Sequence, residues 1–190
     1  MAKAKGKAKA KSRTSAPMKQ DAIALLKADH REVEQWFEQF EKARDDERKL
    51  TLATKICNAL TVHTTIEEEI FYPAFLEATQ DRDLHHEAEI EHDGAKKLIV
   101  AIEASGPDDD CYDSKVKVLS EMIKHHVKEE EQSGGMFAEA RKSEMDLVAL
   151  GEKMAARKSQ LEGDLEASDD LPAGARKGKN GAGRVVDSQR

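Results

Sequence analysis

Four stretches of the chain carry apolar residues at spacings of three and four, and each stretch places a histidine in the same series. Such spacing is the pattern of helices that bury one face. A buried imidazole or carboxylate is costly unless it is hydrogen-bonded, ion-paired or bound to a metal. The pattern therefore predicts helices packed around a polar centre. The four series are Leu26, His30, Val33, Phe37 and Phe40; Leu52, Ile56, Leu60, His63, Glu67, Ile70 or Phe71, and Ala74; His85, Ala88, His92, Ala95, Ile99 and Ile102; and Val116, Leu119, Ile123, His126 and Glu130.

The connections between these stretches are short, at roughly residues 44–48, 77–82 and 105–112, so successive helices should lie antiparallel as neighbours. The second stretch should break near Pro73. Charged residues make up 36% of the chain and aromatic residues only 4%, which suits long amphipathic helices better than a β-sandwich. We predict an all-α fold, an antiparallel up-down four-helix bundle with an extra C-terminal helix.

Both ends of the chain are basic and of low complexity. The first twenty residues hold six Lys, one Arg and no acid, and the last twenty are rich in Gly and basic residues, although the net charge is −7. Such segments have little to bury and should be disordered. We predict a basic N-terminal tail (1–17), the bundle with its metal site (18–142), a C-terminal helix (143–163) and a basic C-terminal tail (164–190).

The cysteines, Cys57 and Cys111, are too few and too far apart for a disulfide framework or a zinc-binding C-x-x-C pattern. No stretch approaches the roughly eighteen apolar residues of a membrane span, and no apolar run follows the basic N-terminus. We expect a cytoplasmic protein without a membrane partner. Hydrolase, kinase and dehydrogenase functions have no support, since no nucleophilic triad, phosphate-cradling Gly loop or dinucleotide fingerprint is present.

Two His-x-x-x-Glu pairs are the most informative motifs. In His63–Glu67 and His126–Glu130 the two side chains point the same way, one helical turn apart. If these helices face each other, each His can bind one metal ion while each Glu spans both. A nitrogen and oxygen donor set without thiolate favours iron or manganese over structural zinc. The candidate ligands are His30, His63, Glu67, His92, His126 and Glu130.

Each candidate also has a structural interpretation. A single core histidine such as His30 or His92 is commonly hydrogen-bonded, and a His-x-x-x-Glu pair is commonly a surface ion pair. Their coincidence with the apolar series on four helices favours the metal site. Other polar and aromatic residues receive structural roles. We expect solvent-facing or supporting roles for His85, His86 and His125, a solvated acidic face from Glu68, Glu69, Glu129 and Glu131, and core or bundle-end packing for Trp36, Phe71 and Tyr72.

Four ordered segments resemble the hemerythrin-like, HHE cation-binding family over about residues 20–142. They are Leu25-Leu26-Lys27-Ala28-Asp29-His30-Arg31, His63 followed by Glu67-Glu68-Glu69-Ile70-Phe71-Tyr72-Pro73, Glu91-His92, and His126-Val127-Lys128-Glu129-Glu130-Glu131. The resemblance implies a non-haem di-iron centre. Its cofactor would be two iron ions (Fe2+ or Fe3+), with or without an oxo or hydroxo bridge, in preference to manganese or zinc. His30 and His63 would bind one iron, His92 and His126 the other, and Glu67 and Glu130 both.

Two departures separate the chain from the oxygen carriers of that family. Ala88 stands where a fifth histidine is expected, and the last bridging acid is Glu130 at +4 from His126 rather than an Asp at +5. Water, an acid such as Glu89 or a second exogenous ligand could take the position left by Ala88. The set is closer to the di-iron proteins linked to nitric-oxide stress and iron-sulfur-cluster repair than to reversible oxygen carriers.

Three functions follow for such a chain. The leading one is binding or reaction of small ligands (oxygen, nitric oxide, peroxide) in stress response or sensing, with or without turnover. The second is an iron donor or iron-sulfur-cluster repair factor. The third is a metal-binding module whose Lys-rich residues 3–13 make weak, non-specific contacts with nucleic acid phosphates, although the same tail could instead fold back on the acidic body.

Overall fold

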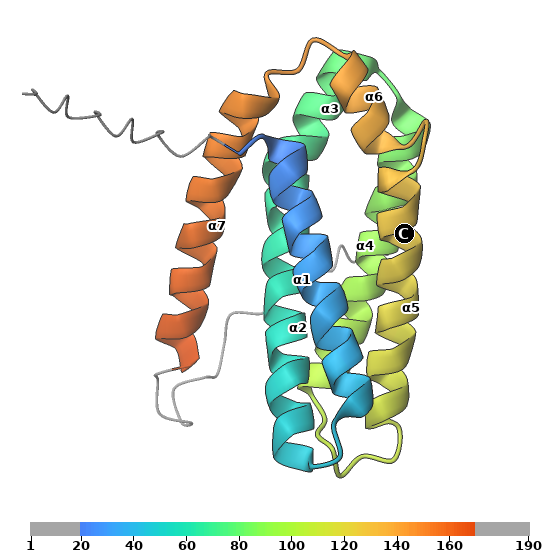
Figure 1. Cartoon of the computed structure of the whole chain (residues 1–190), viewed down its shortest axis with the longest axis vertical. Coiled ribbons are helices and arrows are strands. Elements are labelled where there is room, and N and C mark those ends of the chain that lie inside the picture. Colours follow the sequence, from blue (N-terminus) through green and yellow to red (C-terminus); the bar gives the residue numbers. More distant parts are fainter. Residues whose placement is uncertain (1–19, 170–190) are drawn as a thin grey trace, which may run out of the picture.

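The computed structural model describes residues 20–169, and the predicted tails at 1–17 and beyond 169 lie outside this range. The predicted all-helical fold is confirmed. The described elements are α1 (Ala22–Lys42), α2 (Asp46–Ile66), the π-helical turn η1 (Glu67–Phe71), α3 (Tyr72–Thr79), α4 (Arg82–Glu103), α5 (Tyr112–Glu131), α6 (Met136–Lys142) and α7 (Leu147–Asp169). The long helices α1, α2, α4 and α5 form the bundle, and α7 lies alongside it next to α1 and α2 (Figure 1). None of the described helices is both long and apolar enough to span a membrane.

Aspartates start three of the bundle helices. The side chains of Asp21 and Asp45 each accept a hydrogen bond of 2.8 Å from the backbone N–H three residues later, and Asp81 accepts one of 3.2 Å. A cap of this kind satisfies one of the N–H groups that the first helical turn leaves unpaired. Because the connections before α2 and α4 are only a few residues long, each capped helix begins beside the end of the preceding one.

The predicted break near Pro73 is wrong. The helix continues from α2 through η1 into α3, and Pro73 lies in the first turn of α3. Proline is tolerated here because the π-helical turn η1 just before it already interrupts the regular N–H pairing. The helix ends instead at Gln80, whose left-handed conformation (φ 59°) stops α3.

The core consists of two apolar clusters on either side of a polar layer. One cluster joins the end of α1 and the start of α2 to the end of α4 and the start of α5, and includes Phe37, Leu60 and Ile123. The other joins the opposite ends of α1, α2 and α4 to α3, α6 and α7, and includes Leu26 and Phe137. The histidines of all four apolar series fall between the two clusters.

Two helices at the C-terminal side differ from the expectation. The short helix α6, which the sequence pattern did not predict, follows the Gly134-Gly135 turn and buries Phe137. Helix α7 continues to Asp169, so residues 164–169, expected in the tail, belong to this helix. It crosses the start of α1 at Gly151, where an added Cβ would lie 2.5 Å from the backbone oxygen of Gln20.

We predict that Gly151→Ala lowers the free energy of unfolding by about 1–3 kcal/mol, because the methyl group would push α7 away from the α1 backbone. Gly163→Ala, on the same helix but with no atom near the added Cβ, should raise it by about 0.5–1 kcal/mol. Urea unfolding of both variants measures the difference. Equal effects would contradict the close crossing at Gly151.

Candidate metal centre

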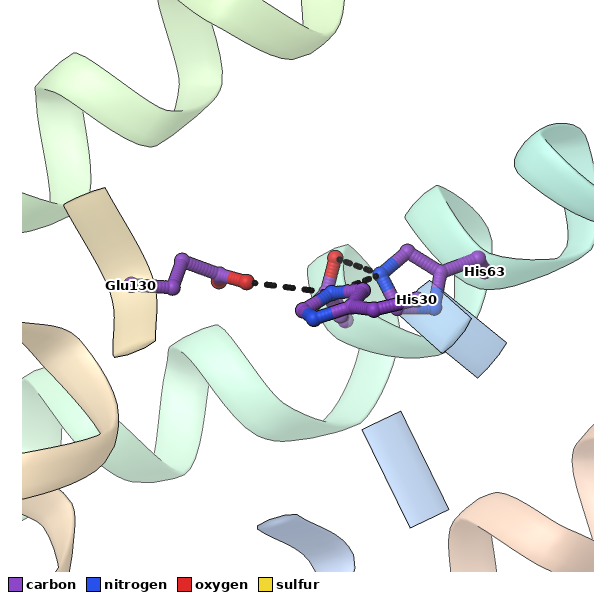
Figure 2. Close-up of side chains that lie close together, drawn as sticks. His30, His63 and Glu130 are labelled. Atoms are coloured by element: carbon purple, nitrogen blue, oxygen red, sulfur yellow. Dashed lines mark hydrogen bonds and ion pairs between the residues drawn. The ribbon is translucent and has the colours of Figure 1, made fainter. Parts of the chain in front are cut away.

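Four buried imidazoles meet in the middle of the bundle as two pairs. The Nε2 atoms of His30 on α1 and His63 on α2 are 3.1 Å apart, and those of His92 on α4 and His126 on α5 are 3.3 Å apart. Each residue is at most 6% exposed. Figure 2 shows His30 between His63 and the carboxylate of Glu130. The structure therefore brings the predicted histidines together from all four bundle helices.

Two fully buried carboxylates lie between these pairs. One oxygen of each carboxylate contacts two imidazoles, one from each pair. The contacts are Glu67 Oε2 to His63 Nε2 at 3.2 Å and to His92 Nε2 at 3.4 Å, and Glu130 Oε2 to His30 Nε2 and to His126 Nε2 at 3.5 Å each. The donors form two groups that could each hold an ion and that share Glu67.

A second set of carboxylates lies behind the imidazoles, each paired with an outward-facing Nδ1. The pairs are His30 with Glu131 at 2.9 Å, His92 with Glu68 at 2.9 Å, His126 with Glu91 at 2.8 Å and His63 with Asp29 at 3.5 Å. An ionised carboxylate can only accept, so in the three pairs of His30, His92 and His126 Nδ1–H donates and, in the neutral imidazole, the lone pair of Nε2 points to the centre. Nδ1 of His63 faces Asp29 without a hydrogen bond.

These pairs correct the prediction that Glu68 and Glu131 belong to a solvated face. Each of the four outer acids directly precedes or follows one candidate ligand in the chain, but it faces the histidine of a neighbouring helix. The acid on α5 faces the histidine of α1, the acid on α1 that of α2, the acid on η1 that of α4, and the acid on α4 that of α5. The sequence signal was an acid directly beside a candidate ligand in every series. Glu69 instead pairs with Arg157 of α7 at 2.7 Å.

The two central carboxyls have opposite electrostatic settings. Burial raises the pKa of Glu67, but the charges of His63 and His92 outweigh it and lower the pKa to about 2. Burial and the negative charge of Glu67 hold the pKa of Glu130 well above its usual range. The negative charge on Glu67 therefore makes ionisation of the nearby Glu130 unfavourable. Cations bound between the two carboxylates would remove this repulsion.

The imidazoles of the two pairs also differ. Burial lowers the pKa of His30 to about 4. Burial acts in the same sense on His92, but its interactions with Glu67 and Glu68 outweigh it and raise the pKa to about 9.

The unpaired atoms at the centre test whether the residues fit metal ions. Among the residues that the structure describes, both side-chain oxygens of Glu67 and Oε2 of Glu130 are buried without a hydrogen bond. Buried oxygens are costly in this state unless a cation binds them. Four imidazole nitrogens and two carboxylates are a suitable donor set for iron, manganese or zinc. The residues therefore fit a pair of metal ions.

The structure places Tyr72 beside the centre and Glu89 away from it. Tyr72, expected to pack in the core or at the bundle end, is buried in the core, and its hydroxyl also lies 3.1 Å from His92 Nε2 and 3.4 Å from Glu130 Oε1. The exposed Glu89 lies 3.4 Å from His85 Nδ1 and belongs to neither central group. Sequence periodicity missed Tyr72 because η1 changes the helical phase before it.

A small apolar cavity of about 20 Å³ adjoins the four imidazoles. Its apolar wall includes Val33, Leu60, Ile123 and Val127. The last two also line a surface groove of about 230 Å³ between α1 and α5, so they separate the cavity from solvent.

Comparison with known proteins agrees with this geometry. The sequence profile of the Hemerythrin HHE cation binding domain matches residues 21–133, more than half of the chain, and the protein belongs to this family. A crystal structure of an HHE cation binding domain-containing protein from Mycobacterium kansasii superposes with a TM-score of 0.66 and 23% identity, covering 78% of this chain and 91% of the other. The fold is therefore the hemerythrin-like bundle.

A DNA nickase of Nostoc sp. (strain PCC 7120) is 26% identical over 117 residues, which are 62% of this chain. The match spans 32% of the nickase, so this chain corresponds to about a third of that protein's length.

Without metal, the free energy of unfolding should fall as the pH is raised from 6.5 to about 9. His92 has a folded pKa of about 9 against an ordinary 6.5, so its stabilising effect is complete below 6.5 and is lost as the pH passes 9. The raised pKa of Glu130 acts in the same direction. The effect is roughly 1.4 kcal/mol per unit of pKa shift.

Urea unfolding in a chelator at constant ionic strength measures this dependence. Glu130→Gln cannot ionise and should show a shallower decline than the unchanged protein. A stability that rises across this range would contradict the assignment.

Proposed function

We propose that the protein holds two iron ions through the six central residues. His30 and His63 bind one ion, His92 and His126 bind the other, and Glu67 and Glu130 bind both. The observation that carries this proposal is the position of the two carboxylates, each in contact with one imidazole of either pair. The family's cation-binding domain supports a metal at this site.

The centre acts, in this proposal, on small ligands such as oxygen, nitric oxide or peroxide in stress response or sensing. A pair of iron ions supplies reversible binding or electron transfer to such molecules. The protein contributes an apolar cavity of about 20 Å³ beside the imidazoles, room for one or two atoms of water size. Larger substrates do not fit this space.

The alternative functions stay predictions. An iron donor would use the same six residues, and tight retention of both ions would count against it. Contact with nucleic acid depends on residues 3–13, which lie outside the described range. The similarity to part of a DNA nickase is the observation that favours testing such contact.

His63→Ala should reduce the iron content from about two ions per chain to one or fewer, because it removes a nitrogen donor of one half of the centre. His86→Ala is the matched control, since this exposed histidine on α4 belongs to a separate surface group with His85 and Glu89, and the variant should keep the two ions of the centre. Metal analysis after anaerobic loading and desalting measures both. An unchanged content in His63→Ala would overturn the proposed site.

The visible absorption of the iron-loaded protein tests the proposed ligands. Bands of the ferric form should shift on addition of azide or peroxide, and those of the ferrous form on addition of nitric oxide. Iron-loaded protein with no response to any of them would refute the small-ligand function while leaving the metal site intact.

Val127→Phe should slow azide binding about tenfold, the effect of a barrier higher by about 1.4 kcal/mol, because the larger ring would obstruct the path from groove to cavity. Val127→Ala should speed it. Val118→Phe, at an exposed position on the same helix, controls for the added ring. Stopped-flow absorption measures the rates at equal iron content. Identical rates in the three variants would exclude this path.

A further inference from the structure

Tyr72 is the one aromatic hydroxyl that reaches the candidate centre within the described residues. Its side chain is 1% exposed, and its ring centroid is 5.4 Å from that of His92. The hydroxyl oxygen lies 3.1 Å from His92 Nε2 and 3.4 Å from Glu130 Oε1. Both atoms belong to residues proposed above as iron ligands, so the phenol is placed at the edge of one half of the centre.

The hydrogen bond between Tyr72 and His92 conflicts with metal binding. In the neutral imidazole that metal binding requires, His92 Nδ1–H donates to Glu68 and Nε2 has one lone pair, which faces the Tyr72 hydroxyl. The same lone pair cannot also bind an ion. When His92 binds metal, the phenol must therefore find another partner, either Glu130 or the ion itself.

The donor spacing is compatible with coordination of the ion. Two donors at right angles on one ion, each at about 2.1 Å, are about 3.0 Å apart. The Nε2 atoms of His30 and His63 are 3.1 Å apart, and those of His92 and His126 are 3.3 Å apart. The 3.1 Å between the Tyr72 oxygen and His92 Nε2 is the same kind of spacing.

The helix is built in a way that brings Tyr72 to this position. Tyr72 is nine positions after His63, and at 100° per residue a regular α-helix would place the two side chains about half a turn apart. The π-helical turn η1 accommodates an extra residue and rotates the following helix back by roughly 100°. On the facing helix, Ala88 is buried in the same apolar cluster as Tyr72, and its small side chain leaves room for the ring.

We propose that Tyr72 is a further iron ligand, whose phenolate oxygen completes the half of the centre formed by His92 and His126. On coordination the phenol proton is released to solvent and the oxygen binds ferric iron, with no change of oxidation state. This inference rests on the proposed function, because it requires iron at the central residues. It adds a ligand that the His-x-x-x-Glu motifs do not contain.

The chain offers a clear test because it contains only two tyrosines, Tyr72 and Tyr112. Tyr112 is equally buried but packs against Phe40 in the other apolar cluster. Tyr72→Phe and Tyr112→Phe are therefore matched variants that each remove one buried hydroxyl. All three proteins are loaded with iron, oxidised, analysed for metal, and examined by visible absorption and resonance Raman spectroscopy.

The unchanged protein and Tyr112→Phe should show a ferric-phenolate charge-transfer band with enhanced tyrosinate ring vibrations, and Tyr72→Phe should lose both while retaining iron. If Tyr72→Phe does not fold, the signals of the unchanged protein and their persistence in Tyr112→Phe still decide the assignment. Iron-loaded protein without these signals, or with signals that Tyr112→Phe abolishes, overturns the role of Tyr72 alone. Failure to take up iron overturns the proposed function as well.

Discussion

The structure depends on a layer of six ionisable side chains buried across the middle of its core. Removing a charge from water costs several kcal/mol even after the surroundings relax, so such a layer needs compensation at every atom. The Nε2 atoms are 3.1 Å apart in one histidine pair and 3.3 Å apart in the other, which is close to the distance between two ligands of one ion. The two apolar clusters cover the layer on both sides. The bundle is therefore two small cores joined by a candidate metal centre.

The outer carboxylates make this layer a property of the whole bundle. Three of the four imidazoles are hydrogen-bonded to an acid on the adjacent helix, and the fourth, that of His63, faces the carboxylate of Asp29 on α1 at 3.5 Å. Helix α7 extends this arrangement, since Lys158 Nζ lies 2.6 Å from the Asp29 carboxylate that faces His63. Burial raises the pKa of Asp29, but His63 and Lys158 outweigh it and keep the pKa below its usual value. The extra helix thus supports one imidazole of the centre.

Much of the fold could be predicted from the sequence because burial imposes a period. The apolar series placed His30, His63, His92 and His126 correctly on inward faces, and the all-α bundle followed from their spacing. The roles of Glu68 and Glu131 could not be predicted in this way. The periodicity of a single helix places these carboxylates outside its apolar face and so predicts that they face solvent. Only the packing of the neighbouring helix shows that each one contacts an imidazole.

Tyr72 was hidden for a different reason. After Glu67, burial resumes at Phe71 and Tyr72, which are four and five residues further along the chain. The sequence left the choice between Ile70 and Phe71, three and four residues after Glu67, open. The π-helical turn resolves this ambiguity by changing the helical phase. Pro73, two residues after the turn ends, stands where regular N–H pairing is already interrupted.

That change of phase also makes the two halves of the centre unequal. Tyr72 lies against the half formed by His92 and His126, whereas the cavity is lined by α1, α2 and α5 and adjoins all four imidazoles. A phenolate would fill a coordination position at the half formed by His92 and His126 and leave the half formed by His30 and His63 without this extra donor. With this division, a small ligand arriving past Ile123 and Val127 would find the more open position at the half formed by His30 and His63, and one irregular turn of helix would determine where it binds.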